Sequence, residues 1–477
     1  AALALIAWRN LPDGYYFADD FQILYEVANG NMVSLLFEPE WRHVNTTRNA
    51  LLAIEYFLFG ARPGAFYVVA LALHCVNGFL LYRLSKRVTR QPAISAAVAA
   101  IWVLSPLHVG TLSWCAAHGH ALIATTLFWM LGRVAALGEA VSAPSLRDAL
   151  LWGLGMFVIA TSYGVGLGIA MAFPLISIVI RGSWPSPSVR LVFAAEMAVL
   201  AAGYLTLQAL YPVPHTRWTP TVLPALGTIL SHPGAIALLG IEFSKVGVTA
   251  LALGPMFRPD EMPSILIWLV PCGFVTLWIA SLYRGTPSER RWLAGLVLLG
   301  LAGYAGVALG KGFQWAEDPT RGALEARYHY APQAMWALAT AVALSVLHRR
   351  APRAVTSTAA ACAVALAIVL IERPIEMRPH LHERQSTERA LAEIHEAVSR
   401  TPPGETVYIV NRPFEGMAFL SQFQEKWAFP GIAGVFVVFF EHDEIGGRRV
   451  RFIAIEPEQM EATQRGGRIS SLLVPRP

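Results

Sequence analysis

The sequence predicts an all-α polytopic membrane protein of about 11 transmembrane helices, followed by a small C-terminal α/β domain. Of its 477 residues, 55% are hydrophobic and only 14% are charged, whereas soluble domains carry about 25% charged residues. Apolar segments of roughly 20 residues, the length that crosses a bilayer as a helix, recur along most of the chain. These observations exclude a soluble globular protein, and an outer-membrane barrel would show short alternating segments instead.

The predicted crossings are separated by short polar connections. We expect them near residues 64–82, 93–109, 115–137, 149–161, 165–180, 189–210, 263–283, 292–310, 331–347 and 354–371. The run 1–8 is too short to cross, and we expect it to be the end of a helix or the remains of a processed signal. The four cysteines lie inside apolar segments without C-x-x-C spacing, so neither a disulfide framework nor a zinc site is implied.

Basic residues orient the predicted helices. Arginine and lysine cluster in alternate connections, and Arg83, Lys86, Arg87 and Arg90 occupy the first of them. Such connections face the cytoplasm under the positive-inside rule, which accounts for the net charge of +5 without a nucleic-acid partner. The non-cytoplasmic side then receives residues 10–63, 161–164, 211–262, 311–329 and the tail after residue 372.

One apolar stretch, residues 222–253, breaks the alternation of sides. A single crossing there would place Arg284 and Arg291 opposite every other basic connection, so the stretch must cross either zero times or twice. Glu242 and Lys245 occupy its middle. These charges favour an element that lies on the membrane surface or re-enters it.

The composition changes at Arg373-Pro374, which separates the predicted transmembrane domain, residues 1–372, from residues 373–477. Residues 386–400 open with a Ser/Thr cap and show helical spacing. Strand-like runs follow at residues 406–410, 435–440, 450–455 and 469–474. We therefore expect a small extracytoplasmic α/β domain at the C-terminus.

Two adjacent acids, Asp19 and Asp20, stand in the predicted first outer loop, residues 10–63. A loop of this length without a transmembrane segment is usually functional. A carboxylate in a partly desolvated pocket can accept a proton from an attacking hydroxyl, which would make one acid a general base. Alternatively, either acid caps a helix that continues to Ala28.

A series of short motifs follows these acids along the chain. It consists of Asp19-Asp20-Phe21, Trp41-Arg42-His43-Val44-Asn45, Tyr56-Phe57-Leu58-Phe59-Gly60, Leu73-His74-Cys75-Val76-Asn77-Gly78-Phe79-Leu80-Leu81-Tyr82, Ser105-Pro106-Leu107-His108 and Glu325-Ala326-Arg327-Tyr328-His329-Tyr330-Ala331-Pro332. In this order, over residues 10–350, the chain resembles the GT-C superfamily of membrane glycosyltransferases. It is most similar to the O-mannosyltransferases that carry tetratricopeptide repeats and to their bacterial relatives, although its own C-terminal domain shows no repeat.

The resemblance implies transfer of a hexosyl or mannosyl group from a polyprenyl-phosphate donor to a protein or glycan acceptor on the outer face. By the match, Asp19 or Asp20 would be the general base. The departing lipid phosphate needs cations at the membrane surface. The candidates for this role are Arg327 first, then Lys311, Arg321 and Arg42. The residues expected to line the pocket are His43, His108, His118, His120, Tyr328 and Tyr330. The two tyrosines are alternatively anchors at the membrane interface.

Three departures from the family pattern remove charge from this pocket. Gly110 stands where relatives often have an acid. His118-Gly119-His120 follows the tryptophan after which relatives place G-R-x-D/E, and Ser162-Tyr163-Gly164 replaces their S-K-E. Either the donor or acceptor differs from that of the relatives, or catalysis has been lost and only the fold remains.

The histidines raise the hypothesis of a divalent metal. His108, His118 and His120 are expected near one membrane surface, and imidazole is a common metal ligand. However, residues at i and i+2 do not share a helix face. His74 and Asn77, at i and i+3, are expected to make interhelical hydrogen bonds instead.

Three classes of function stay open. The first is a membrane glycosyltransferase that binds membrane lipid and a polyprenyl-linked sugar. The second is a catalytically silent GT-C-fold subunit that acts as a scaffold in a larger membrane complex, with residues 373–477 contacting a partner. A transporter is disfavoured, because the ionisable residues are assigned to one outer face and paired half-helix breaks are not found. We expect a bacterial inner membrane protein with a periplasmic C-terminal domain.

Overall fold

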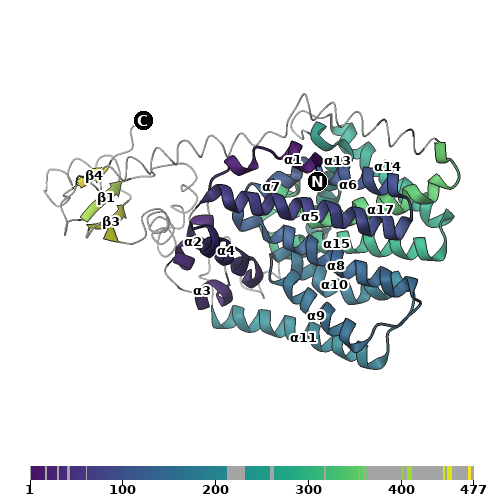
Figure 1. The fold of residues 1–477 in the computed structure, drawn as a ribbon, viewed down its shortest axis with the longest axis horizontal. Coiled ribbons are helices and arrows are strands. Elements are labelled where there is room, and N and C mark those ends of the chain that lie inside the picture. Colours follow the sequence, from purple (N-terminus) through teal and green to yellow (C-terminus); the bar gives the residue numbers. More distant parts are fainter. Residues whose placement is uncertain are drawn as a thin grey trace.

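The chain is mostly helical, and its long helices pack side by side in one bundle (Figure 1). The computed structural model describes residues 2–16, 19–28, 32–39, 43–60, 62–211, 233–257, 263–315 and 318–353, a few isolated residues, and four short strands between residues 406 and 473.

The helices come in three groups along the chain. The N-terminal group is α1 (Ala2–Ala7), η1 (Leu11–Asp13), α2 (Asp19–Ala28), α3 (Met32–Phe37), α4 (Thr46–Phe59) and α5 (Pro63–Thr89). The middle group is α6 (Pro92–Val103), η2 (Pro106–His108), α7 (Val109–Leu112), η3 (Cys115–Ala117), α8 (Gly119–Glu139), α9 (Leu146–Ala160), α10 (Gly164–Arg181) and α11 (Pro187–Leu210). The last group is α13 (Pro233–Leu253), η4 (Gly254–Met256), α14 (Ser264–Arg284), α15 (Pro287–Trp315), α16 (Pro319–Ala323), η5 (Ala326–His329) and α17 (Tyr330–His348).

Local sequence explains where the long helices begin and end. Proline occupies the first turn of α5, α6 and α11, where its missing N–H costs no helical hydrogen bond. Ser145 and Asp148 form a capping box at the start of α9. Gly182 ends α10 in the left-handed conformation, with φ of 66°.

The described part of the chain contains eight helical stretches that are long and apolar enough to cross a membrane. The number rises to nine if the pair Pro92–Val103 and Pro106–Leu112, bent by 51°, is one span. The chain is therefore an integral membrane protein. The count of about 11 stays a prediction. Helix α9 has only 15 residues, and most of the predicted crossing at 354–371 lies outside the described residues.

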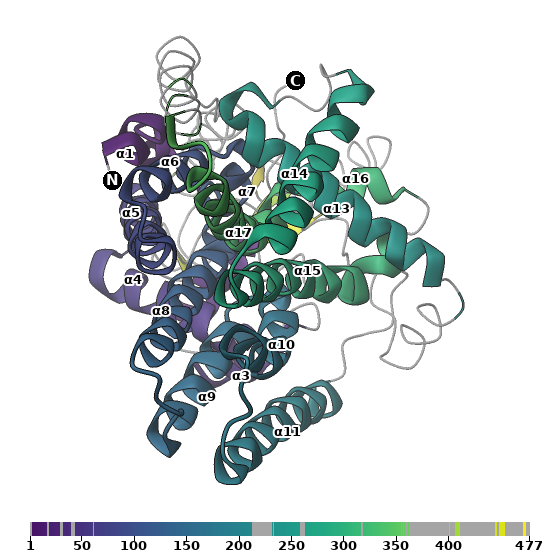
Figure 2. The same cartoon turned by 90° about the vertical axis from the view of Figure 1, so that its right-hand side faces the viewer.

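Helix α17 is the centre of the bundle. Of the residues in its most apolar 18-residue segment, 89% are buried, because α5, α6, α8, α14 and α15 all contact the helix (Figure 2). In contrast, α11 lies at the edge of the bundle beside α9, and only 6% of the residues in its most apolar 18-residue segment are buried. The apolar surface of α11 is thus left to face lipid.

Glycines bring α10 and α15 into close contact. A Cβ atom on Gly168 would lie 2.6 Å from the backbone oxygen of Ala302 and 3.0 Å from the Cα of Gly306. Only residues without a side chain allow two backbones to approach so closely, as is common between membrane helices.

Helix α13 covers most of the stretch 222–253. Residues 233–253 form a continuous helix that packs against α14, α15, α16 and α17 and is apolar enough to cross. A continuous apolar helix of this length favours a crossing, and the surface-lying or re-entrant element stays a prediction. Its two charges neutralise each other, since the Lys245 Nζ lies 2.5 Å from a carboxylate oxygen of Glu242. The other crossing of the predicted pair would fall in residues 212–230, outside the described residues.

A buried polar network ties α5 to α8 and α17. The Nδ1 of His74 lies 2.8 Å from the hydroxyl of Tyr330, and the amide of Asn77 donates to the same hydroxyl at 3.3 Å and to the backbone oxygen of Ala121 at 2.9 Å. Thr125 completes the network by donating to Asn77 at 2.7 Å. The predicted interhelical hydrogen bonds of His74 and Asn77 are confirmed.

Four short strands form one sheet in the C-terminal part of the chain. They are β1 (Thr406–Val410), β2 (Glu444–Ile445), β3 (Arg448–Ile453) and β4 (Ser471–Leu473), in the order β2-β3-β1-β4. β1 pairs in parallel with β3 and β4, while β2 pairs antiparallel with β3. The helix predicted for residues 386–400 and the strand predicted for 435–440 fall outside the described residues, apart from Arg400.

Candidate active site

The short link between α7 and α8, residues 114–118, organises the candidate site. It contains the 3-10 turn η3, its residues 115–118 are buried, and η3 packs against α2. Its backbone and side chains receive contacts from three elements that are distant in sequence, namely α2, α4 and η5.

Asp20, in the first turn of α2, reaches this link directly. Its Oδ1 accepts a hydrogen bond from the backbone N–H of Ala116 at 2.6 Å, and the residue is 1% exposed. Asp20 therefore joins α2 to η3. Helix α2 begins at Asp19, so Asp20 is its second residue and not its N-cap.

Arg48 fixes the same link from α4. Its NH1 donates to the backbone oxygen of Ala116 at 3.2 Å, while its Nε and NH2 donate to the side-chain oxygen of Asn49 at 2.9 and 2.7 Å. Asn49 in turn donates to the backbone oxygen of Leu35 in α3. Both peptide groups of Ala116 are thus held by charged side chains of α2 and α4.

Arg327, more than 200 residues further along the chain, also contacts the link. Its guanidinium lies over the ring of Trp114 at 4.8 Å and over the ring of Tyr328 at 5.1 Å, and it pairs with Glu325 at 3.3 Å. Its Nε is buried and has no hydrogen-bond partner among the described residues. A buried charged donor without a partner is unusual and marks this arginine as a candidate ligand-binding group.

Histidine and tyrosine rings gather next to Arg327. The ring of His120 lies 4.3 Å from that of Tyr163 and 6.0 Å from that of Tyr328, and His43 stacks on Tyr163 at 5.8 Å. Both ring nitrogens of His120 are buried without a hydrogen-bond partner among the described residues. Of the predicted lining residues, His43, His120 and Tyr328 thus lie together.

A second buried carboxylate, Glu55 of α4, stands close to Asp20. It is 2% exposed, and neither carboxylate oxygen has a hydrogen-bond partner in the described part of the chain. Burial, and to a smaller extent the charge of Asp20, raises the pKa of Glu55 to about 8. Glu55 is therefore protonated at neutral pH, while Asp20 beside it receives a backbone N–H.

Gly110 of α7 lies in close contact with η5. A Cβ atom at this position would lie 2.4 Å from the backbone nitrogen of Arg327 and 2.9 Å from the carbonyl carbon of Ala326. Helix α7 and η5 approach so closely here that no side chain fits. This close contact holds the backbone of Arg327 in place.

The other predicted histidines stand in different surroundings. His108 lies among His74, Trp102 and Tyr330, whereas His118 contacts Tyr67. Across the described ranges, no group of three or more histidine, cysteine or acidic residues is arranged to hold a metal ion. The proposed histidine metal site is therefore not formed by these three residues.

The remaining predicted residues are placed only in part. Tyr330 is fully buried in the network with His74 and Asn77, so it is not an interface anchor. Arg321 is exposed on α16. Asp19 and Lys311 lie in α2 and α15, but their side chains are outside the description, as is the whole of Arg42.

Sequence reasoning missed Glu55 and Arg48. Both belong to α4, and they lie seven positions apart, which places them on one helix face with Leu52. An ionisable pair on the buried face of a helix is the signal that could have found them.

Comparisons with known proteins add a weak likeness in fold. No family model and no curated protein matches the sequence. Among solved structures, the chain is similar to the crystal structure of ArnT from Cupriavidus metallidurans bound to undecaprenyl phosphate, with 12% sequence identity and a TM-score of 0.36. The match covers 99% of this chain and 88% of that chain. A likeness at this level carries no functional assignment, so the function of this chain must rest on its own residues.

Proposed function

We propose that this protein is a membrane glycosyltransferase with a GT-C-like fold, which moves a sugar from a polyprenyl-phosphate donor to an acceptor on the outer face. One observation carries the proposal. Asp20 and Arg327 are 307 positions apart, yet both contact the link 114–118, Asp20 at Ala116 and Arg327 at Trp114. The proposed base for the acceptor and the proposed cation for the leaving phosphate thus both contact residues 114–116 of one segment.

Asp20 is the proposed general base. It would take the proton of the acceptor hydroxyl as that oxygen forms its bond to the anomeric carbon of the sugar. The bond between the anomeric carbon and the phosphate oxygen breaks in the same step, with inversion. Glu55, protonated beside Asp20, leaves Asp20 as the member of the pair suited to accept a proton.

Arg327 is the proposed ligand of the leaving polyprenyl phosphate. The phosphate gains negative charge as the sugar departs, and a guanidinium stabilises that charge best when it is already positioned. The rings of Trp114 and Tyr328 hold the guanidinium, while its Nε stays unpaired among the described residues. The unpaired nitrogens of His120 are suited to sugar hydroxyls.

The experiment is sugar transfer by the purified chain in membranes supplied with labelled polyprenyl-phosphate sugars. Asp20→Asn is the informative variant, because asparagine keeps an oxygen for the Ala116 N–H but cannot accept the proton. Asp13→Asn, an exposed acid of the same loop, is the control. Full activity of Asp20→Asn would overturn the role of Asp20 as base.

A catalytically silent subunit is the second candidate, and Gly110 is the observation that favours it. The acid of the family pattern has no space at this position, so that charge cannot be restored there. Transfer by the parent protein from any donor of a broad set excludes this candidate. Absence of transfer across the set, together with stable association of residues 373–477 with another membrane protein, would support it.

A further inference from the structure

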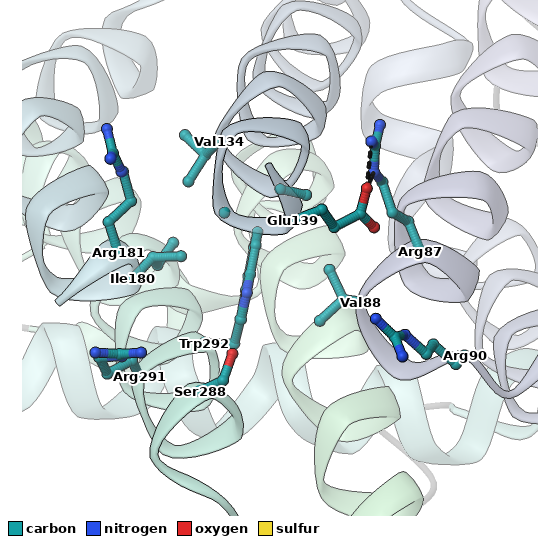
Figure 3. A pocket seen from close by; sticks show the side chains of 12 residues that line it. Arg87, Val88, Arg90, Val134, Glu139, Ile180, Arg181, Ser288, Arg291 and Trp292 are labelled. Atoms are coloured by element: carbon teal, nitrogen blue, oxygen red, sulfur yellow. Dashed lines mark hydrogen bonds and ion pairs between the residues drawn. The ribbon is translucent and has the colours of Figure 1, made fainter. Parts of the chain in front are cut away.

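A basic pocket lies at the end of the bundle remote from the candidate active site (Figure 3). It has a volume of about 230 Å³, and its charged lining residues are Arg87, Arg90, Glu139, Arg181 and Arg291. Four guanidinium groups against one carboxylate leave three positive charges in excess. In Figure 3, Arg181 and Arg291 stand on one side, Arg87 and Arg90 on the other, and Trp292 lies between them.

The pocket belongs to the other face of the membrane. Helix α8 begins beside His120 and ends at Glu139, and α10 begins next to Tyr163 and ends at Arg181. The 21 residues of α8 span about 30 Å, the thickness of the hydrocarbon core. By the positive-inside rule the pocket is cytoplasmic.

Ordinary helix-end chemistry explains only part of this cluster. Arg87 is paired with Glu139, whose Oε2 accepts from its Nε at 3.0 Å and its NH2 at 2.5 Å, and Arg181 donates to the backbone oxygen of Ser142 at 2.8 Å. Both also lie at the C-terminal ends of helices, where cations are favoured. The same holds for Arg90, the C-cap residue of α5, whereas Arg291 is not accounted for in this way.

Arg291 is the residue that indicates a ligand. Its Nε is buried and has no hydrogen-bond partner within the described ranges. It lies near the start of α15, where the helix dipole does not favour a cation. Its guanidinium rests on Gly182, where a Cβ atom would lie 1.9 Å from NH1. The guanidinium is thus held in place, with a donor that no described residue uses.

We propose that this pocket binds a phosphate group on the cytoplasmic face, with Arg291 and Arg90 as its principal ligands. Guanidinium groups bind phosphate through charge-assisted hydrogen bonds. The volume is below the roughly 300–1,000 Å³ of sites for larger organic ligands, which suits a phosphate with a small substituent. The phosphate is either the headgroup of an anionic phospholipid or a soluble phosphate, since both share this chemistry.

The test uses the purified full chain with two probes. Phosphatidylglycerol retention is measured by native mass spectrometry, with phosphatidylcholine as the neutral lipid, and inorganic phosphate is titrated while thermal unfolding is followed. The variants are Arg291→Gln and Arg90→Asn, the latter because asparagine tolerates the left-handed conformation of residue 90. Their controls are Arg284→Gln and Arg147→Gln, exposed arginines outside the pocket lining.

A specific site predicts about a tenfold loss of affinity in each pocket variant and no change in either control. Loss for phosphatidylglycerol alone identifies a lipid headgroup, and loss for inorganic phosphate identifies a soluble ligand. The proposal is overturned if neither probe binds, or if pocket and control variants weaken binding equally, because the arginines would then be ordinary surface charges.

Discussion

The carboxylate of Asp20 accepts the backbone N–H of Ala116 at 2.6 Å, a contact that joins positions 96 residues apart. This hydrogen bond gives Asp20 a structural task beside its proposed chemical one. Substitutions that separate the two tasks are therefore the most informative.

We predict that Asp20→Asn lowers the rate of sugar transfer by about 100-fold to 10,000-fold, the usual contribution of a general base, and changes stability little. Asp20→Ala should lower both the transfer rate and the stability. The Ala116 N–H would be buried without an acceptor, at a cost of about 1–3 kcal/mol. Transfer rates and thermal unfolding of the two variants check this. Equal transfer rates in the parent and Asp20→Asn would leave Asp20 with the structural role alone.

Glu55 should make the stability of the protein depend on pH. Its pKa is about 8 in the folded chain and 4.5 in the unfolded one, so the folded state holds a proton that the unfolded state has lost. The stabilisation is fully present below pH 4.5 and falls as pH rises toward 8, by about 1.4 kcal/mol per pH unit.

The variant Glu55→Gln removes this dependence. We expect unfolding temperatures of parent and variant, measured from pH 5 to pH 9, to diverge as pH rises, with the variant the more stable at pH 8. Parallel curves would mean that Glu55 is not a buried acid with a raised pKa.

Arg327→Lys tests the planar stacking of the guanidinium. Lysine keeps the charge but loses the flat contact between Trp114 and Tyr328 and the fixed fork of donors. We predict that binding of polyprenyl phosphate weakens by roughly tenfold or more. Arg62→Lys, an exchange at an exposed arginine just before α5, is the matched control and should bind as the parent does. An unchanged affinity of Arg327→Lys would show that a point charge suffices.

Gly110→Ala tests the close contact between α7 and η5. The new methyl group would lie 2.4 Å from the backbone nitrogen of Arg327, so we expect a loss of about 1–3 kcal/mol in stability and a lower transfer rate. Gly132→Ala in α8 is the control, because nothing lies within 4 Å of a Cβ atom there. Thermal unfolding measures both, and equal stability of the two variants would contradict the contact.

The helices of the bundle follow from local sequence, but their contacts do not. Helices α5, α8, α10 and α14 lie close to their predicted ranges, because hydropathy over some 20 residues is a property of the chain itself. In α13, the two charges Glu242 and Lys245 pair with each other across one turn of the same helix. A charge inside an apolar run does not by itself reveal whether it is neutralised.

By itself, the sequence determined that this chain is an integral membrane protein, and it identified Asp20, Arg327 and His120 as residues of interest. Only the tertiary structure decided that Asp20 and Arg327 contact one link, that Glu55 is buried beside Asp20, and that Gly110 has no space for a side chain. The reason is physical. Membrane insertion depends on the summed hydropathy of neighbouring residues, whereas burial and pairing depend on which distant helices come to lie side by side.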